Sequence, residues 1–98
     1  MIRTFACKQT ERLFHDTPPI KRLPRNLWDA MRRKLQVLHY ARSLDDLRAL
    51  PGNRFETLKG GRAGQYSIRV NRQWRVCFTW TQEDRGGSAD GVEIVDYH

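Results

Sequence analysis

The stretch QYSIRVNRQWRVCFTWT, residues 65–81, decides the fold because apolar and polar side chains alternate along both of its halves. Its apolar positions are Tyr66, Ile68 and Val70 in the first half, and Trp74, Val76, Phe78 and Trp80 in the second. A period of two residues is typical of β-strands with one apolar face. The polar run 71–73 separates the halves, so the sequence predicts a hairpin of two strands, 65–70 and 74–81.

The residues before this hairpin predict helices. Apolar side chains recur at the spacing of one helical face at Leu27, Met31, Leu35 and Leu38. Together with Pro24, which suits a first helical turn, they predict a helix over about residues 24–41. A shorter helix is expected over residues 43–50 with Ser43 as its N-cap. One or two helical turns are expected over residues 8–15.

Three further strands are expected, at residues 1–6, 55–59 and 91–97. The segment 82–91 is polar and rich in glycine, and is expected to be a flexible loop. The order of strand, helices and four strands predicts an α+β fold. We therefore expect one compact domain over residues 1–98, with helices packed on one face of a mostly antiparallel sheet.

The charge of the chain points to an acidic partner. The 98 residues carry a formal net charge of +7, which favours nucleic acid, a membrane surface or an acidic protein as the partner. The span from Arg54 to Arg75 holds six basic residues and one acidic residue, Glu56. The sequence therefore predicts a local basic patch in the second half of the chain.

The two cysteines, Cys7 and Cys77, are expected to be buried free thiols. The sequence contains no C-x-x-C motif and no His/Cys cluster with zinc spacing, so neither a metal nor a cofactor is expected. It shows no signal peptide and no transmembrane run. A reducing cytoplasm is the simplest location that fits these features.

The predicted hairpin places arginines on the sheet face away from the helices. Arg69 and Arg75 alternate with the apolar residues of their own strands, so they point to the opposite face. Lys59 and Arg62 flank the predicted turn at Gly60-Gly61, at the rim of that face. Such a cationic floor suits a phosphodiester backbone, although a solvated charged face gives the same pattern.

The printed sequence ends on Asp96-Tyr97-His98, directly after strand residues. Cleavage of RNA by its own 2′-hydroxyl needs a base, an acid and cations near the phosphate, and these side chains can transfer protons. A histidine at a chain end is more commonly a surface residue than a catalytic one. The residues alone leave both interpretations open.

Several segments together resemble the HigB branch of the RelE/ParE toxin superfamily. They are 1–5, 51–58, 64–71, 73–78 and the terminal Asp96-Tyr97-His98. The resemblance implies a compact microbial RNase-like fold and ribosome-dependent mRNA cleavage that inhibits translation and growth.

The resemblance also implies roles for individual residues. The catalytic lysine of the family falls on Lys59, its terminal catalytic cluster on Asp96, Tyr97 and His98, and its phosphate-contacting arginine on Arg75. Some members place a histidine where this chain has Glu56, so Glu56 is a candidate base. Arg54, Arg62 and Arg69 are added as RNA-binding candidates because they belong to the basic segment.

The implied partners are an antitoxin and the ribosome. The antitoxin would be a helix-turn-helix protein similar to HigA, and the toxin–antitoxin complex would bind operator DNA through it. The implied substrate is mRNA in the A site of the 30S subunit. Two alternatives remain: a ParE-like inhibitor of DNA gyrase without enzymatic activity, and a simple RNA- or ribosome-binding module. Cleaved transcripts, broken DNA or neither would distinguish them.

Overall fold

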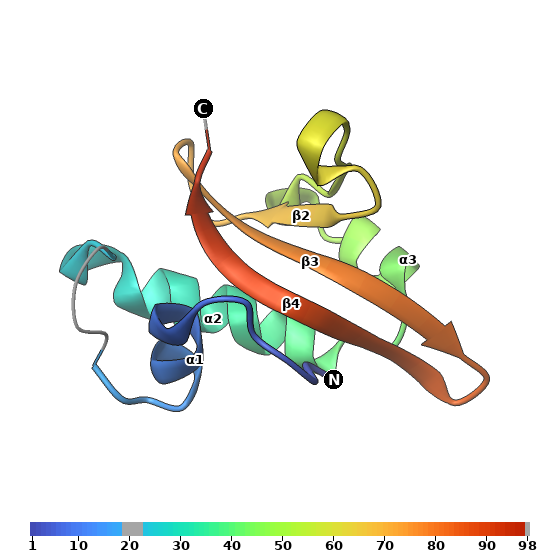
Figure 1. The fold of residues 1–98 in the computed structure, drawn as a ribbon, viewed down its shortest axis with the longest axis horizontal. Coiled ribbons are helices and arrows are strands. Elements are labelled where there is room, and N and C mark those ends of the chain that lie inside the picture. The colour runs from blue at the N-terminus through green and yellow to red at the C-terminus, as the bar shows by residue number, and fades with distance from the viewer. Residues whose placement is uncertain (19–22, 98) are drawn as a thin grey trace.

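The computed structural model describes residues 1–18 and 23–97. A helical layer contains α1 (Lys8–Phe14), α2 (Trp28–Tyr40) and α3 (Leu44–Arg48). Short 3-10 helices occur at η1 (Arg25–Leu27), η2 (Pro51–Asn53) and η3 (Gly60–Arg62). Four strands follow: β1 (Glu56–Thr57), β2 (Tyr66–Arg69), β3 (Trp74–Glu83) and β4 (Gly86–Asp96). They form one sheet in the order β1-β2-β3-β4, and each neighbouring pair is antiparallel (Figure 1).

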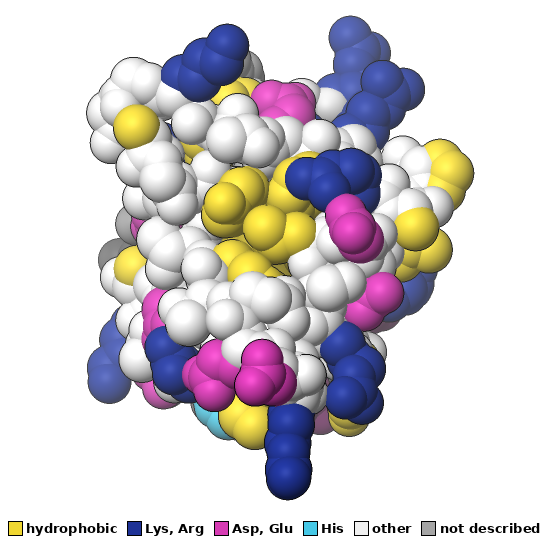
Figure 2. Space-filling view, turned by 90° about the vertical axis from the view of Figure 1, so that its right-hand side faces the viewer, with side chains coloured by type: hydrophobic (Ala, Val, Ile, Leu, Met, Phe, Trp, Pro, Cys, Tyr) yellow, Lys and Arg dark blue, Asp and Glu magenta, His cyan; other side chains and the backbone are white. Residues whose placement is uncertain are grey.

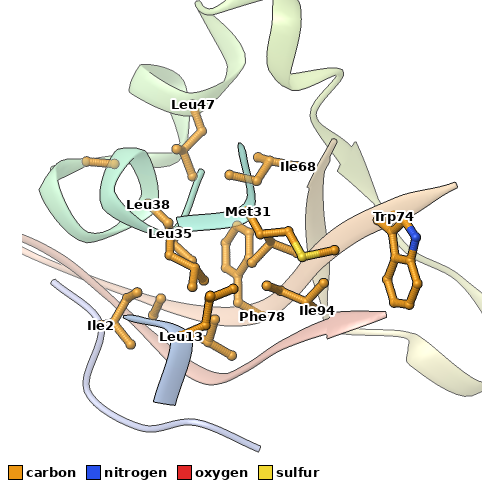
Figure 3. Close-up of a cluster of buried hydrophobic side chains, with 14 of the residues drawn as sticks. Ile2, Leu13, Met31, Leu35, Leu38, Leu47, Ile68, Trp74, Phe78 and Ile94 are labelled. Atoms are coloured by element: carbon orange, nitrogen blue, oxygen red, sulfur yellow. The ribbon is translucent and has the colours of Figure 1, made fainter. Parts of the chain in front are cut away.

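The sheet and the helices meet along the apolar faces that the sequence predicts. Ile68, Val76, Phe78 and Ile94 from the strands pack with Met31, Leu35 and Leu38 from α2 (Figure 3). Burying one such side chain contributes roughly 1.5–3 kcal/mol to the free energy of folding. The α+β fold with helices on one sheet face is confirmed.

The helices begin and end close to their predicted bounds. The expected helix 24–41 appears as η1 followed by α2, and Leu27 is only half-buried at its start. α3 begins at a capping box, in which the Ser43 hydroxyl accepts from the Asp46 N–H while the Asp46 carboxylate accepts from the Ser43 N–H. These reciprocal bonds satisfy N–H groups that a helix start leaves free.

The N-terminal segment is not a full strand. It runs parallel to β4 and forms only two isolated bridges, Ile2↔Ala89 and Phe5↔Val92. Gly91 of β4 lies between these bridges and has a φ angle of 60°. Its N–H donates to the Thr4 hydroxyl instead of to a main-chain carbonyl. This irregularity interrupts the ladder, which explains why the strand expected at 1–6 is reduced to two bridges.

The prediction of a flexible loop at 82–91 is wrong. β3 continues to Glu83, and β4 starts at Gly86, so only Asp84 and Arg85 remain as a turn between the two strands. Composition suggested a loop because the segment is polar and rich in glycine. In the folded chain, the Trp80 ring lies over Gly87 and covers its backbone, which makes a glycine in this strand a packing requirement.

The strand expected at 55–59 is shorter than predicted. Only Glu56 and Thr57 pair with β2, and the expected turn at Gly60-Gly61 is the 3-10 helix η3, with Gly60 at φ 63°.

Within the described residues, no helix is long and apolar enough to cross a membrane.

Substituting Gly87 with alanine is expected to destabilise the protein by about 1–3 kcal/mol, because overpacking displaces a neighbouring group. A Cβ atom at this position would lie 2.2 Å from the Trp80 ring, which would have to move. Urea unfolding followed by tryptophan fluorescence measures the loss. Gly61→Ala is the matched control, since nothing lies within 4 Å of the added atom. Equal stability of the two variants would contradict the packing role of Gly87.

Candidate functional site

A cationic pocket opens at the end of the sheet where the β2–β3 loop meets the end of β4. Its volume is about 420 Å³. Its lining consists of Arg54, Glu56, Arg69, Asn71, Arg72, Arg75 and Tyr97. Four guanidinium groups against one carboxylate make the pocket a site for a polyanion. In Figure 1, the end of β4 lies beside the loop that joins β2 to β3.

Strand register brings the arginines together. Arg69 pairs with Arg75 across β2 and β3, and Arg75 pairs with Val95 across β3 and β4. Because side chains alternate along a strand, these residues face away from the core that contains Ile68 and Val76. Both arginines lie on the sheet face away from the helices, as predicted, but this face is covered at Arg75, which is buried.

Arg75 is the fixed centre of the pocket, with only 7% of its surface exposed. Its Nε donates to the Ser67 hydroxyl at 2.7 Å, and its Nη2 donates to the main-chain carbonyl of Arg54. Its Nη1 lies 3.5 Å from the Glu56 carboxylate, and its guanidinium lies 5.6 Å from the centre of the Tyr97 ring. These contacts hold the guanidinium in one orientation before any ligand arrives.

The carbonyl that meets Arg75 comes from a strained residue. Arg54 follows η2 and has the left-handed conformation φ 43°, ψ 54°, which is uncommon for a residue other than glycine. The preceding Asn53 is fully buried, accepts from Lys34 Nζ at 2.7 Å and donates to the Leu47 carbonyl. Burial lowers the pKa of Lys34. This anchor between α2 and α3 fixes the backbone that presents the Arg54 carbonyl.

The β2–β3 loop positions the other side of the pocket. The Asn71 side-chain oxygen accepts from the N–H groups of Gln73 and Trp74, at 2.9 and 2.8 Å, which fixes the turn. The Tyr97 N–H donates to the Gln73 carbonyl at 2.6 Å. The half-buried Tyr97 ring is therefore held against Arg75 by a main-chain bond beyond the end of β4.

The remaining predicted residues lie in different places. Lys59 is exposed before η3 and does not line the pocket. Arg62 lies over the same sheet face, but it pairs with Glu93 at 3.1 Å, and its charge acts on the buried thiol of Cys77. Burial raises the pKa of this thiol. Both cysteines are free, but Cys7 is only half-buried, so its predicted burial was wrong. Arg62 is thus engaged within the protein.

Asp96 and His98 complete the predicted cluster. Asp96 pairs with the core residue Trp74 in the register of β3 and β4, and its carboxylate accepts from the Gln73 side chain at 3.0 Å. It does not line the pocket that Tyr97 lines. His98 lies outside the described residues. Across residues 1–18 and 23–97, no three His, Cys, Asp or Glu side chains gather as metal ligands would.

Three residues of this site were missed from the sequence: Ser67, Asn71 and Gln73. Arg72 was counted only among the six basic residues of the predicted patch. An Asn at the start of a three-residue hairpin loop signals an Asx turn, and Ser67 lies one place from Ile68 on the arginine face. The signal was therefore present for Asn71 and Ser67. The pairing of Gln73 with the end of β4 had no signal in the sequence.

A second surface differs in character from the pocket. Figure 2 shows hydrophobic side chains gathered in the middle of the face at the right of Figure 1, with basic and acidic side chains around them. Charges of both signs border this patch, whereas the pocket lining is dominated by arginine. The pocket is therefore the better candidate for a nucleic-acid site.

Substituting Ser67 with alanine is expected to lower the free energy of unfolding by about 1–3 kcal/mol, since it leaves a buried Arg75 N–H without its partner. Chemical denaturation measures this loss. Ser88→Ala, on the half-buried part of β4, is the matched control and is expected to change stability by less than about 0.5 kcal/mol. If both serines tolerate alanine equally, Ser67 does not hold Arg75.

Comparison with known proteins identifies the family. The profile described as "RelE-like toxin of type II toxin-antitoxin system HigB" matches residues 3–98. The chain belongs to this family of HigB-like toxins. It is 38% identical over 97 residues to Toxin HigB-1 of Vibrio cholerae, which covers 99% of this chain and 94% of that protein. The HigB relationship fits the nuclease interpretation better than the gyrase alternative.

Solved structures show the same fold at low sequence identity. The YoeB–YefM complex from Staphylococcus aureus has a chain with a TM-score of 0.53 and 15% identity, covering 100% of this chain and 98% of its own length. The YoeB/ParE toxin from Agrobacterium tumefaciens has a TM-score of 0.55 and 13% identity, covering 98% of each chain. The RelE-like fold predicted from the sequence is confirmed.

Proposed function

We propose that this HigB-like toxin is a ribosome-dependent endoribonuclease that cuts mRNA and thereby inhibits translation and growth. The observation that carries the proposal is the buried Arg75, held by three polar contacts at the floor of a cationic pocket and adjoined by Tyr97. A preorganised cation stabilises charge that develops on phosphoryl oxygens, and stabilisation of this kind is a large term in many enzymes.

The proposal assigns the proton transfers of RNA transesterification to residues of the pocket. The 2′-hydroxyl loses its proton to a base as its oxygen bonds to phosphorus, and the bond to the 5′ oxygen breaks as an acid protonates that oxygen. Glu56, about half exposed beside Arg75, is the proposed acceptor of the first proton. The Tyr97 phenol is the proposed donor of the second. Lys59, which does not line the pocket, and His98 remain predicted participants.

Three arginines of the pocket, two of them exposed and Arg69 half-buried, suit the RNA backbone. Arg54, Arg69 and Arg72 line the pocket around Arg75, and their guanidinium groups can each meet a phosphate. Arg62, which pairs with Glu93, would have to leave that carboxylate to reach RNA. Binding of the ribosome–mRNA complex should weaken with salt, with a log–log slope near about −2 if three contacts form with a single strand.

The proposed partners follow from the family. We propose a helix-turn-helix antitoxin similar to HigA, which would also carry the complex to operator DNA. The related YoeB of Staphylococcus aureus is described in complex with YefM, which supports a protein partner. The proposed site of action is mRNA in the A site of the 30S subunit, and hence the cytoplasm.

The test compares mRNA with and without ribosomes. Purified protein should cut an mRNA positioned in the decoding site and leave the naked transcript nearly intact, because the ribosome supplies substrate orientation worth up to about 7–11 kcal/mol. Equal cleavage of both would contradict ribosome dependence. Intact transcripts together with broken, gyrase-bound DNA would contradict the nuclease and favour the ParE-like alternative.

A further inference from the structure

Two neighbouring residues at the end of β4 are held by the same loop residue. The Tyr97 N–H donates to the Gln73 carbonyl at 2.6 Å, and the Gln73 side-chain amide donates to the Asp96 carboxylate at 3.0 Å. The last paired residue of β4 is Asp96, opposite Trp74. Chain segments beyond the last strand pair fray unless they are held, so these two bonds determine where Tyr97 lies.

Asp96 and Tyr97 cannot both face the pocket. Successive side chains of a strand point to opposite faces. Tyr97 lines the pocket, on the face of Arg75 and its partner Val95. Asp96 shares its register position with Trp74, which packs in the core cluster on the other face. The carboxylate contacts the loop through Gln73 and does not line the cationic pocket.

The loop that holds the strand end is itself rigid. Asn71 accepts from two consecutive main-chain N–H groups, those of Gln73 and Trp74. Gln73 is thus fixed in position before it meets Asp96 and Tyr97. Because the loop is rigid, the residues bonded to it are fixed as well. Among them is Tyr97, whose ring centre lies 5.6 Å from the Arg75 guanidinium.

We propose that Gln73 and Asp96 form a clamp that positions Tyr97 over Arg75. Asp96, expected from the family resemblance to be catalytic, is then a positioning residue whose carboxylate accepts a hydrogen bond and transfers no proton. The proposal rests on the function proposed above. It assigns a role to Gln73, for which the resemblance implied none.

The experiment compares Asp96→Asn with Asp96→Ala. An asparagine side-chain oxygen can still accept from the Gln73 amide, but it cannot transfer a proton. The clamp therefore predicts that Asp96→Asn cleaves ribosome-bound mRNA within about 2-fold of the native rate. Asp96→Ala and Gln73→Ala should each lower kcat about 3- to 10-fold with little change in KM, as expected for one lost hydrogen bond. The double variant should lose no more than either single one.

Gln82→Ala is the matched control. Gln82 also donates through its side-chain amide, to the Arg42 carbonyl, but it lies near the other end of β3 and should leave kcat unchanged. The clamp is overturned if Asp96→Asn falls as far as Asp96→Ala, by about 10²-fold or more, while Gln73→Ala stays active. That result would restore proton transfer to Asp96.

A second measurement is independent of cleavage. The clamp predicts that the Tyr97 amide exchanges its hydrogen faster in Gln73→Ala and Asp96→Ala than in the native protein, while Asp96→Asn exchanges at the native rate. The Val76 amide in the sheet centre should be unchanged in all of them. Unchanged Tyr97 exchange would refute the clamp. Native protein that fails to cut ribosome-bound mRNA would instead refute the proposed function, and the exchange result would still decide the clamp.

Discussion

Replacing Arg75 with glutamine is expected to lower the rate of ribosome-dependent mRNA cleavage by about 10²- to 10³-fold, the usual cost of removing one preorganised group that stabilises transition-state charge. Glutamine can still donate to the Ser67 hydroxyl or the Arg54 carbonyl, the partners of the native side chain, but it carries no charge. Single-turnover cleavage of ribosome-bound mRNA measures the effect on the chemical step.

Two further variants make this result interpretable. Arg33→Gln removes an exposed arginine of α2 and should cleave at the native rate, which shows that net charge alone is not decisive. Arg75→Lys keeps the charge but loses the planar fork that meets three partners, so we expect an intermediate rate. Native rates in a folded Arg75→Gln protein, verified by circular dichroism, would remove Arg75 from the chemistry.

Replacing Tyr97 with phenylalanine is expected to lower cleavage by about 10²- to 10⁴-fold, the range for loss of a general acid. Phenylalanine keeps the ring that faces the Arg75 guanidinium, so ligand binding should change little and the loss should appear in kcat. The measurement is a single-turnover rate at saturating ribosome–mRNA complex.

Tyr97→Leu separates the two properties of this side chain. It removes both hydroxyl and ring, and should weaken binding as well as the rate, since a base can stack on an aromatic ring. A fully active Tyr97→Phe beside an inactive Tyr97→Leu would mean that Tyr97 is a stacking surface. Proton donation would then belong to another group, with Lys59 and His98 as the remaining candidates.

The sequence predicts those parts of the fold that depend on local periodicity. Alternation over 65–81 places Ile68, Val76 and Phe78 in the core, and helical spacing does the same for Met31 and Leu35. In both cases, the side chains that define the period are the ones that pack in the core, so the pattern predicts the strands and the helix correctly.

The predictions that failed concern segments whose structure depends on contacts between residues far apart in the sequence. The strand region at 82–91 is stabilised by the Trp80 ring over Gly87 and by the Gly87 N–H, which donates to the Arg42 carbonyl in another layer. Neither contact is visible in local composition, which is that of a loop. The strand predicted at 55–59 was too long, because only two of its residues pair with β2.

The site shows the same division. The shared face of Arg69 and Arg75 follows from strand alternation. Alternation also implies that Asp96 and Tyr97 point to opposite faces, and a strand ending in these residues could have been interpreted in that way. The contacts that fix Arg75, from Ser67 and the Arg54 carbonyl, depend on register and on a left-handed residue, which the sequence does not reveal.

The long β3–β4 hairpin divides the molecule into regions of unequal local stability. Residues 75–77 of β3 pair with strands on both sides, whereas Thr79 to Glu83 pair with β4 alone. Segments with fewer neighbours open with a lower free-energy cost and exchange their amide hydrogens sooner. Gradual heating would therefore loosen the hairpin tip around Asp84 first, while the residues around Arg75 keep their arrangement until the whole sheet unfolds.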